Sequence, residues 1–176
     1  VRSDAALDLV KKAMASSPDD PLYVVAVGCI TNIASALLIE PKIIENIVIV
    51  WLGGNALYWP HQKEFNLMQD VPAARVVLNS GVPLVIMPCA NVISHFHTSI
   101  PEMKAYLQGK STLSDYLLNM TIEYSGGKDT WSKVIWDVTA VAWLVNPSWL
   151  PTNIEHSPVL TDQITYSFDH TRHFIR

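Results

Sequence analysis

A carboxylate and an amide stand two residues apart near the end of the stretch from Gly53 to Asn66. The stretch follows Ile47 to Val50, a mostly β-branched run typical of a buried strand, so its two leading glycines fall where a strand of an α/β sheet ends. Ligands bind in the crevice at such ends. Residues two apart on an extended segment face the same way, so we expect Glu64 and Asn66 to hydrogen-bond neighbouring hydroxyls while Phe65 faces the core. The alternative is a solvated loop anchored by that phenylalanine.

The same stretch carries Asn55 and the aromatic residues Tyr58 and Trp59. Polar groups that bind hydroxyls, placed beside flat aromatic faces, suit a sugar joined to a planar base. Most tryptophans of the chain are expected in the core. Trp59, in the loop, and Trp136, next to an aspartate, are the two for which stacking on a base and packing in the core both remain open.

Asp137 stands directly ahead of residues 138 to 145, which are apolar nearly all round until Asn146 and Pro147 end the run. A helix of this kind is predicted to be central in the fold. The acid has two interpretations. It caps the helix and interacts favourably with the helix dipole, or it is a hard oxygen ligand for a divalent cation.

His95 and His97 have the spacing of two imidazoles on one side of a strand, which is one element of a zinc site. No third ligand follows at a recognisable spacing. The chain also lacks the G-x-S-x-G elbow, the P-loop and the G-x-G-x-x-G loop, so serine-hydrolase and nucleotide-phosphate functions have no marker here.

Helical and strand patterns alternate along the chain. Amphipathic spacing predicts helices, and continuous apolar runs bounded by turn residues predict buried strands. The predicted helices cover residues 4–15, 31–39, 71–78, 101–107, 114–124 and 138–145, and the predicted strands cover 21–28, 47–50, 82–87 and 159–168. This order is typical of βαβ units. We therefore predict an α/β fold with a mostly parallel sheet flanked by helices, as a single domain over residues 1–176.

The composition narrows the classes of partner and compartment. Hydrophobic residues make up 49% of the 176, and the net charge is −4 with basic residues scattered, which argues against a nucleic-acid surface. No apolar run of about 18 residues and no signal-peptide core is present, which predicts no membrane partner. Cys29 and Cys89 both lie beside apolar runs and are expected to be free, buried thiols, in keeping with a cytoplasmic protein.

Five pieces of the chain resemble the inosine-uridine-preferring nucleoside hydrolases, and they come in that family's order between about residues 20 and 147. They are Val27-Gly28-Cys29-Ile30-Thr31-Asn32-Ile33-Ala34, Gly53-Gly54 with Glu64-Phe65-Asn66, Asp70 with Ala73-Ala74, Ser80-Gly81-Val82-Pro83-Leu84, and Trp136-Asp137-Val138-Thr139-Ala140-Val141-Ala142. The resemblance implies part of a Rossmann-like nucleoside hydrolase fold and cleavage of the N-glycosidic bond of purine or pyrimidine nucleosides, with a place in nucleoside salvage.

The resemblance also implies a bound Ca²⁺ that touches the ribose hydroxyls and the attacking water, with an aspartate as general base. By position, Asp137 resembles a calcium-ligating aspartate, and Glu64 and Asn66 resemble the ribose-binding pair. The backbone carbonyl ligand is expected from the loop between Cys89 and Ile93, at Val92.

The chain departs from the family pattern in three places. The family's D-x-D-x-x-x-D-D motif is missing, so the general base and most calcium ligands are expected in a segment before residue 1. The loop between Gly54 and Glu64 is shorter than the common pattern, which leaves Asn55 as a substitute for the family's asparagine. Trp136 stands where many relatives have a histidine, and its indole can stack or wall the pocket but cannot protonate a leaving base.

Two functions from different classes follow. The first is the C-terminal part of a calcium-dependent nucleoside N-ribohydrolase, with the 176 residues alone expected to be inactive because their oxygen ligands are too few. The second is a non-catalytic remnant that binds a nucleoside or sugar, or a module that associates with itself or with a separate N-terminal piece. Uncovered sheet edges predict a homo-oligomer in either case. A third option, an unrelated α/β hydrolase or sugar-binding fold, requires the five collinear matches to be coincidental.

Overall fold

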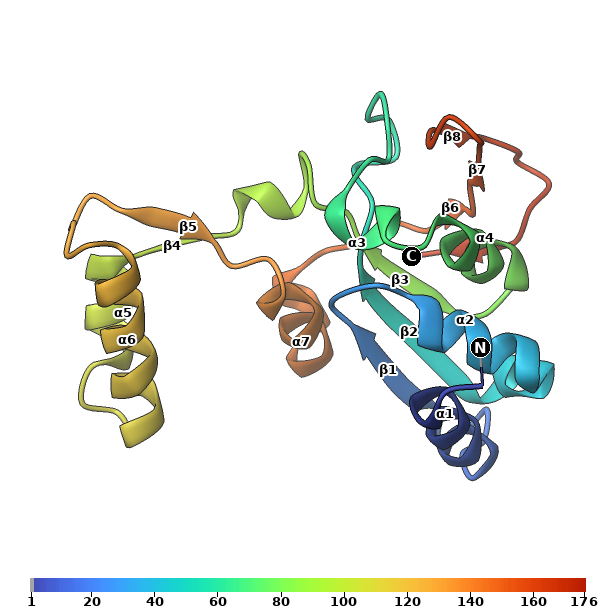
Figure 1. The fold of residues 1–176 in the computed structure, drawn as a ribbon, viewed down its shortest axis with the longest axis horizontal. Coiled ribbons are helices and arrows are strands. Elements are labelled where there is room, and N and C mark those ends of the chain that lie inside the picture. The colour runs from blue at the N-terminus through green and yellow to red at the C-terminus, as the bar shows by residue number, and fades with distance from the viewer. Residues whose placement is uncertain (1) are drawn as a thin grey trace. The chain divides into compact units, whose positions relative to one another are not determined.

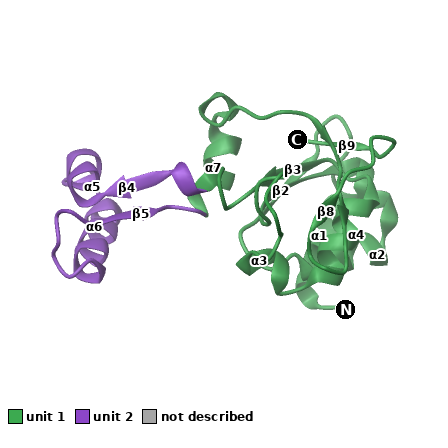
Figure 2. Cartoon of the chain, turned by 90° about the horizontal axis from the view of Figure 1, so that it is seen from above, with its two compact units in different colours: residues 1–93, 137–176 green, residues 94–136 purple. Residues whose placement is uncertain are grey.

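The computed structural model describes residues 2–176, which form two compact units (Figure 2). The first unit contains the described residues up to Ile93 together with Asp137–Arg176, and the second is Ser94–Trp136. A single domain over residues 1–176 stays a prediction.

The first unit is built on a parallel three-stranded sheet with the order β1 (Leu22–Ala26), β2 (Ile47–Leu52) and β3 (Leu84–Met87) (Figure 1). The three strands are the short apolar runs that the sequence predicts. Their parallel pairing confirms the predicted α/β class. Because the strands are parallel, their carboxyl ends meet at one edge, where the Gly53 stretch begins.

Three helices cover one face of the sheet: α1 (Asp4–Met14), α2 (Thr31–Ile39) and α4 (Val71–Ser80). A 3₁₀ turn, η1 (Pro41–Asn46), joins α2 to β2. Local chemistry sets the helix ends, since Ser3 accepts the Ala6 N–H, Asp70 accepts the Ala73 N–H, and Gly81 closes α4 at a φ of 80°. Together these helices and the sheet form the main core.

The opposite face of the sheet packs against α7 (Val138–Val145), whose Trp143 lines a small cavity with Tyr23 and Val85. Only Thr139, Ala140 and Trp143 of this helix are buried. Its valines at 138, 141 and 145 are exposed. The prediction that this helix is central is therefore wrong, because only one side of it contacts the sheet.

The C-terminal residues form two small antiparallel pairs after a 3₁₀ turn, η3 (Pro147–Trp149). These are β6 (Glu155–His156) with β9 (Phe174–Ile175), and β7 (Val159–Leu160) with β8 (Tyr166–Ser167). The predicted continuous strand at 159–168 is thus wrong, since a turn at residues 161–165 folds it into a hairpin. Arg176 donates to the Leu84 carbonyl at 2.9 Å and accepts from the Ile86 N–H at 2.8 Å, so the chain's last residue covers the outer edge of β3.

The second unit pairs two short strands and two helices. Strands β4 (His97–Ser99) and β5 (Ser132–Val134) are antiparallel, and α5 (Ile100–Leu107) packs against α6 (Thr112–Tyr124). Ser99 and Ser111 begin these helices with capping boxes, which confirms the helices predicted there. The 3₁₀ turn η2 (Ile93–His95) precedes β4.

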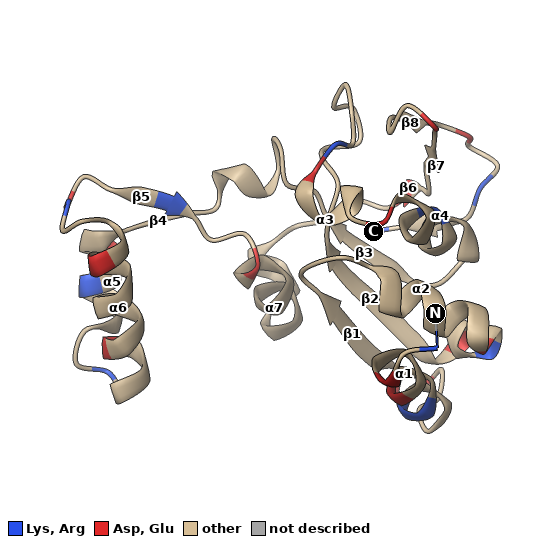
Figure 3. Cartoon of the chain, viewed as in Figure 1, with Lys and Arg blue, Asp and Glu red and all other residues tan. Residues whose placement is uncertain are grey.

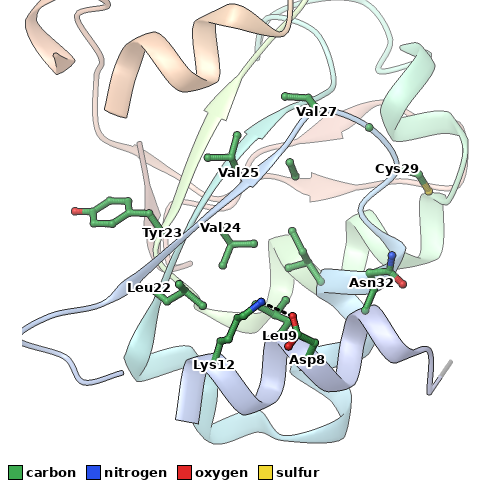
Figure 4. Close-up of a pocket in the computed structure, with 14 residues that line it drawn as sticks. Asp8, Leu9, Lys12, Leu22, Tyr23, Val24, Val25, Val27, Cys29 and Asn32 are labelled. Atoms are coloured by element: carbon green, nitrogen blue, oxygen red, sulfur yellow. Dashed lines mark hydrogen bonds and ion pairs between the residues drawn. The ribbon is translucent and has the colours of Figure 1, made fainter. Parts of the chain in front are cut away.

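The outer edge of β1 carries no further strand within residues 2–176. A groove of about 410 Å³ runs along this edge between β1 and α1, with Leu9 and Val24 on its walls and the Lys12–Asp8 ion pair at one side (Figure 4). Tyr23 is exposed beside it. An unpaired strand edge of this kind can accept another strand.

Charged residues are scattered over both units, without a continuous basic stretch (Figure 3). Within the described residues, no helix is both long enough and apolar enough to cross a membrane.

Candidate functional site

The loops at the carboxyl ends of β1, β2 and β3 are tied to one another by hydrogen bonds. The buried Trp51 indole donates to the Gly28 carbonyl at 3.1 Å, which joins β2 to the loop after β1. The Cys89 N–H donates to the Gly54 carbonyl at 2.8 Å, which joins the loop after β3 to the glycine turn after β2. This edge is therefore a connected platform on which side chains are held in place.

Only glycine fits the turn after β2. A Cβ at Gly53 would lie 2.4 Å from the Trp51 ring, and Gly54 has a φ of 69°, a left-handed conformation. A Cβ at Gly54 would also lie 3.0 Å from the Tyr166 hydroxyl oxygen and 3.1 Å from Gln62 Oε1. The backbone thus packs closely here because it carries no side chains.

Glu64 begins the short helix α3 (Phe65–Met68) and binds backbone N–H groups on both sides of the turn. Its Oε1 accepts from Asn66 at 2.9 Å, and its Oε2 accepts from Leu67 at 3.0 Å and from Gly54 at 2.9 Å. The predicted extended conformation is wrong, because capping by this carboxylate starts a helix. Phe65 is 79% exposed, so it neither faces the core nor anchors a solvated loop.

Asn66 is buried, and its Nδ2 donates to the Leu52 carbonyl at the end of β2, at 2.9 Å. This bond fixes the amide in one orientation. The nitrogen is engaged with the backbone, so the amide oxygen is the end of the group suited to accept from a ligand hydroxyl.

Asn55 is buried and ties two loops together. Its backbone N–H donates to Gln62 Oε1 at 2.6 Å, its Nδ2 donates to the His61 carbonyl at 3.0 Å, and its Oδ1 accepts from the Ala90 N–H at 3.1 Å. Gln62 is fully buried, and no motif in the sequence indicated that it would take part in this site. These bonds make Asn55 a structural tie, while its role toward a sugar stays a prediction.

The two tryptophans considered for base stacking lie in different units. Trp59 is half-buried in the first unit and follows the exposed Tyr58, whose hydroxyl accepts from Asn91 Nδ2 at 2.5 Å. Trp136 is half-buried at the end of the second unit. Stacking of either ring on a base remains a prediction.

Asp137 occupies the N-cap position of α7, but its side chain makes no capping hydrogen bond and it is exposed. The predicted N-cap position is therefore confirmed, but the carboxylate does not cap through a hydrogen bond, and its favourable interaction with the helix dipole stays a prediction. Burial, then the charge and hydrogen bonding of Glu64, and then the charge of Asp137 raise the pKa of the Cys89 thiol to about 12. The two carboxylates accordingly lie in the neighbourhood of one thiol.

The turn that carries Val92 is closed by the Ile93 N–H, which donates to the Pro88 carbonyl at 3.0 Å. Asn91 has a φ of 63°, a conformation that asparagine tolerates better than most residues. The Val92 side chain is exposed. This loop therefore presents backbone groups at the same sheet edge as the Gly54 turn.

The two residues predicted as calcium ligands would not complete a calcium site by themselves. Asp137 and the Val92 carbonyl would offer two oxygen ligands where Ca²⁺ takes six to eight. Within residues 2–176 no three histidine, cysteine or acidic side chains are grouped so that they could hold a metal ion. Among these residues no third such side chain is grouped with His95 and His97, and His97 Nε2 lies 2.8 Å from the Ser94 carbonyl oxygen.

The two thiols differ. Cys29 is exposed, with its Sγ 3.0 Å from Thr31 Oγ1, and Cys89 is half-buried. The expectation of two buried thiols is wrong for Cys29, because the loop after β1 lies at the surface of the sheet edge.

Tyr166 is a second residue that the sequence analysis missed. Its hydroxyl is buried beneath Gly54 and has no hydrogen-bond partner among the described residues. Burial and the charge of Glu64 raise its pKa. No local sequence pattern could predict this contact, because Tyr166 belongs to the C-terminal hairpin and lies far from Gly54 in the sequence.

The family model described as inosine-uridine preferring nucleoside hydrolase matches residues 1–172. Among curated proteins, the pyrimidine-specific ribonucleoside hydrolase RihA of Citrobacter koseri is 30% identical over 156 residues, covering 84% of this chain and 49% of the relative. RihB of Shigella flexneri is 30% identical over 158 residues, covering 82% of this chain and 47% of the relative. The chain thus spans about half the length of these relatives.

Solved structures show the same fold. A purine-preferring ribonucleoside hydrolase from Gardnerella vaginalis has a TM-score of 0.74 and 25% identity, covering 99% of this chain and 56% of that one. An inosine-uridine preferring nucleoside hydrolase from Bacillus anthracis has a TM-score of 0.74 at 15% identity, covering 99% of this chain and 60% of that one.

Proposed function

Because the chain belongs to the inosine-uridine preferring nucleoside hydrolase family, we propose that it supplies the ribose-binding side of a nucleoside N-ribohydrolase site. The observation that carries the proposal is the fixed pair Glu64 and Asn66 at the carboxyl end of β2. Both side chains are oriented by backbone hydrogen bonds before any ligand binds. Such preorganisation is what positions a sugar at low entropic cost.

The chemistry of the pair suits this reaction. N-Glycosidic cleavage passes through an oxocarbenium-like state in which positive charge develops on the ribose ring, and carboxylate and amide oxygens near the ring stabilise that charge. The Asn66 amide oxygen is the proposed acceptor for a ribose hydroxyl, and a second hydroxyl would bind Glu64 in competition with the Cys89 thiol. The free carboxylate of Asp137 adds negative charge at the same edge.

We propose Asp137 and the Val92 carbonyl as two ligands of a calcium ion in the complete enzyme. The Asp137 side chain is exposed and makes no capping hydrogen bond, which supports this role. Because two oxygens fall short of a calcium shell, the other ligands and the general base are proposed to lie outside residues 2–176.

The base of the nucleoside is proposed to lie against Trp59, with Asn55 shaping the loop that carries this ring. Stacking on Trp136, which belongs to the second unit, stays a prediction from the sequence. The names of the relatives include both purine-preferring and pyrimidine-specific enzymes, so either class of base is compatible with the family. Protonation of the leaving base requires a group other than an indole. A role in nucleoside salvage in the cytoplasm completes the proposal.

Ribose binding by the 176-residue chain tests the proposal, measured by protein-detected NMR titration with D-ribose and with inosine. We expect shifts at the Gly54 and Asn66 amides, with affinity reduced at least about tenfold by Asn66→Ala, the loss expected from one good hydrogen bond to a sugar. Phe65→Ala is the control, since this exposed neighbour should leave affinity unchanged. Absence of shifts at both amides would contradict the proposal.

The chain by itself is proposed to be inactive. We expect no turnover of inosine or uridine by the purified 176 residues in the presence of calcium, because the ligand set is incomplete. Turnover that Asp137→Ala abolishes would overturn this expectation.

A non-catalytic module that associates with itself or with another polypeptide is the second candidate. It is favoured by the unpaired outer edge of β1 and the groove beside it (Figure 4). Self-association is part of this proposal, because open sheet edges and exposed apolar faces are commonly covered by a second copy.

A further inference from the structure

Gln62 is fully buried and binds the backbone of the two residues that follow the glycine turn. Its Oε1 accepts from the Asn55 N–H at 2.6 Å, and its Nε2 donates to the Ala56 carbonyl at 3.3 Å. Its own N–H donates to the Ile164 carbonyl at 2.7 Å. The side-chain amide thus closes this loop from the inside, while its backbone is attached to the C-terminal hairpin.

The same two residues also pair with the loop that follows β3. The Ala56 N–H donates to the Ala90 carbonyl at 3.1 Å, and the Ala90 N–H donates to Asn55 Oδ1 at 3.1 Å. Val92, whose carbonyl is proposed as a calcium ligand, comes two residues after Ala90. Gln62 and the loop after β3 therefore bind the same two residues through different groups, so the position of one depends on the other.

Gln62 also bears on the ribose-binding pair. Glu64 comes two residues after it and accepts from the Gly54 N–H at 2.9 Å, directly before the segment that Gln62 binds. A Cβ at Gly54 would lie 3.1 Å from Gln62 Oε1, so the amide packs against the turn itself. A shift of residues 55–56 would therefore move the N–H group that orients Glu64.

We infer that Gln62 is a positioning residue, which holds the Glu64 carboxylate and the Val92 loop in a fixed arrangement. The inference rests on the ribose-binding role proposed above for Glu64. Because Gln62 is fully buried, it acts through the backbone and not by touching the sugar. Misplacement of a binding group by about 1 Å can cost on the order of 100-fold, so a looser loop lowers affinity without removing a contact to the ligand.

The chemistry of the amide makes this role testable. Gln62 offers one acceptor to Asn55 and one donor to Ala56. An apolar side chain of similar length leaves both backbone groups without these partners, and an ionised carboxylate places an acceptor against the Ala56 carbonyl. A protonated carboxyl group has both a donor and an acceptor, so it reproduces the amide. A carboxyl group at this position should therefore restore ribose binding only at low pH.

The affinity of the 176-residue chain for D-ribose, measured by protein-detected NMR titration, tests the inference. Gln62→Met should lower it on the order of tenfold at every pH. Gln62→Glu should bind like the wild type at about pH 5.5 and about tenfold more weakly at about pH 8, because burial and the charge of Glu64 raise the pKa of the introduced carboxyl group. Gln69→Glu, at an exposed glutamine next to α3, adds the same charge and should change nothing.

Hydrogen exchange in the wild-type chain is a second measurement, which needs no variant, and circular dichroism confirms that each variant is folded. The amides of Asn55 and Ala90 should be protected, and D-ribose should slow both. Fast exchange at Asn55, or a Gln62→Met chain that binds D-ribose as tightly as the wild type, would overturn the positioning role alone. A wild-type chain that binds no D-ribose would overturn the ribose-binding role, and the inference with it.

Discussion

At the scale of single residues, Glu64 is defined by what its two oxygens bind. An ionised carboxylate has about four acceptor positions. The N–H groups of Gly54, Asn66 and Leu67 fill three of them, and Cys89 lies beside the fourth. The residue therefore shapes the turn, and a ribose hydroxyl that binds it would compete with the Cys89 thiol, whose hydrogen bond to Glu64 contributes to the raised pKa of that thiol.

The reactivity of the Cys89 thiol depends on the charge of the Glu64 carboxylate. Glu64→Gln removes a negative charge that disfavours the thiolate, so the pKa of Cys89 should fall from about 12. We expect faster alkylation by iodoacetamide at pH 9, measured in a Cys29→Ser background because Cys29 is exposed. Glu45→Gln, a distant exposed carboxylate, should leave the rate unchanged. An unaltered rate in the Glu64 variant would show that this carboxylate does not contribute to the raised pKa of Cys89.

Gly54 is expected to tolerate alanine poorly. Its φ of 69° costs about 1–2 kcal/mol for a residue with a Cβ, and the added methyl would lie 3.0 Å from the Tyr166 hydroxyl oxygen. Gly81→Ala is the matched control, with a φ of 80° but nothing within 4 Å of its Cβ position. Urea unfolding should show a greater loss of stability for Gly54→Ala, and equal losses would mean that crowding contributes nothing.

At the scale of elements, the C-terminal hairpin of β7 and β8 packs against the Gly54 turn and the loop that follows it. Gln62 donates its N–H to the Ile164 carbonyl at 2.7 Å, and Tyr166 packs under Gly54. Arg75 on α4 holds the hairpin by donating to the carbonyls of Leu160 at 3.0 Å and Thr161 at 2.8 Å. The planar guanidinium suits this contact because its donors are fixed in one plane.

Arg75→Lys should loosen the hairpin. Lysine keeps the charge but cannot reproduce the two carbonyl bonds, so we expect a loss of about 1–3 kcal/mol in the free energy of unfolding. Asp162→Asn removes only the ion pair with Arg75. Because the Asp162 side chain is 88% exposed, this change should lower the free energy of unfolding by less than about 1 kcal/mol. Chemical denaturation measures both. An Arg75→Lys chain as stable as the wild type would show that the carbonyl contacts do not hold the hairpin.

At the scale of the whole molecule, the two edges of the parallel sheet differ. Arg176 pairs with β3, whereas β1 has no neighbour among the described residues on its outer side. The family relatives are about twice as long as this chain. Asp137 and the open edge of β1 belong to the same unit. We expect that further oxygen ligands for calcium, and a strand that pairs with β1, come from polypeptide outside the described residues.

The affinity of the 176-residue chain for Ca²⁺ tests whether it supplies more oxygen ligands than Asp137 and Val92. We expect calorimetric titration of the 176-residue chain to show no saturable binding below about 1 mM Ca²⁺, because even sites with a fuller oxygen shell reach only this range in weak modules. Asp137→Asn should then change nothing. Tight binding in the wild type that Asp137→Asn abolishes would show a more complete ligand set than Asp137 and Val92 provide.

The sequence determined the features that depend on neighbouring residues. Apolar runs specified the three parallel strands, and Ser3, Asp70 and Gly81 set helix ends through bonds and backbone angles within one turn. Collinear motifs were sufficient to indicate the family, which the comparisons confirm. These features are local, so the order of residue types is enough to predict them.

Only the tertiary structure decided how the site residues are used. Glu64 caps a helix through the N–H groups of Asn66 and Leu67, and the fold adds the Gly54 N–H as a third donor from the preceding turn. Phe65, at the start of this helix, lies exposed. Asn55 is engaged by a loop that follows another strand, and Tyr166 arrives from the far end of the chain. Their partners are distant in sequence and meet only when the parallel strands place their carboxyl ends side by side, which no local pattern encodes.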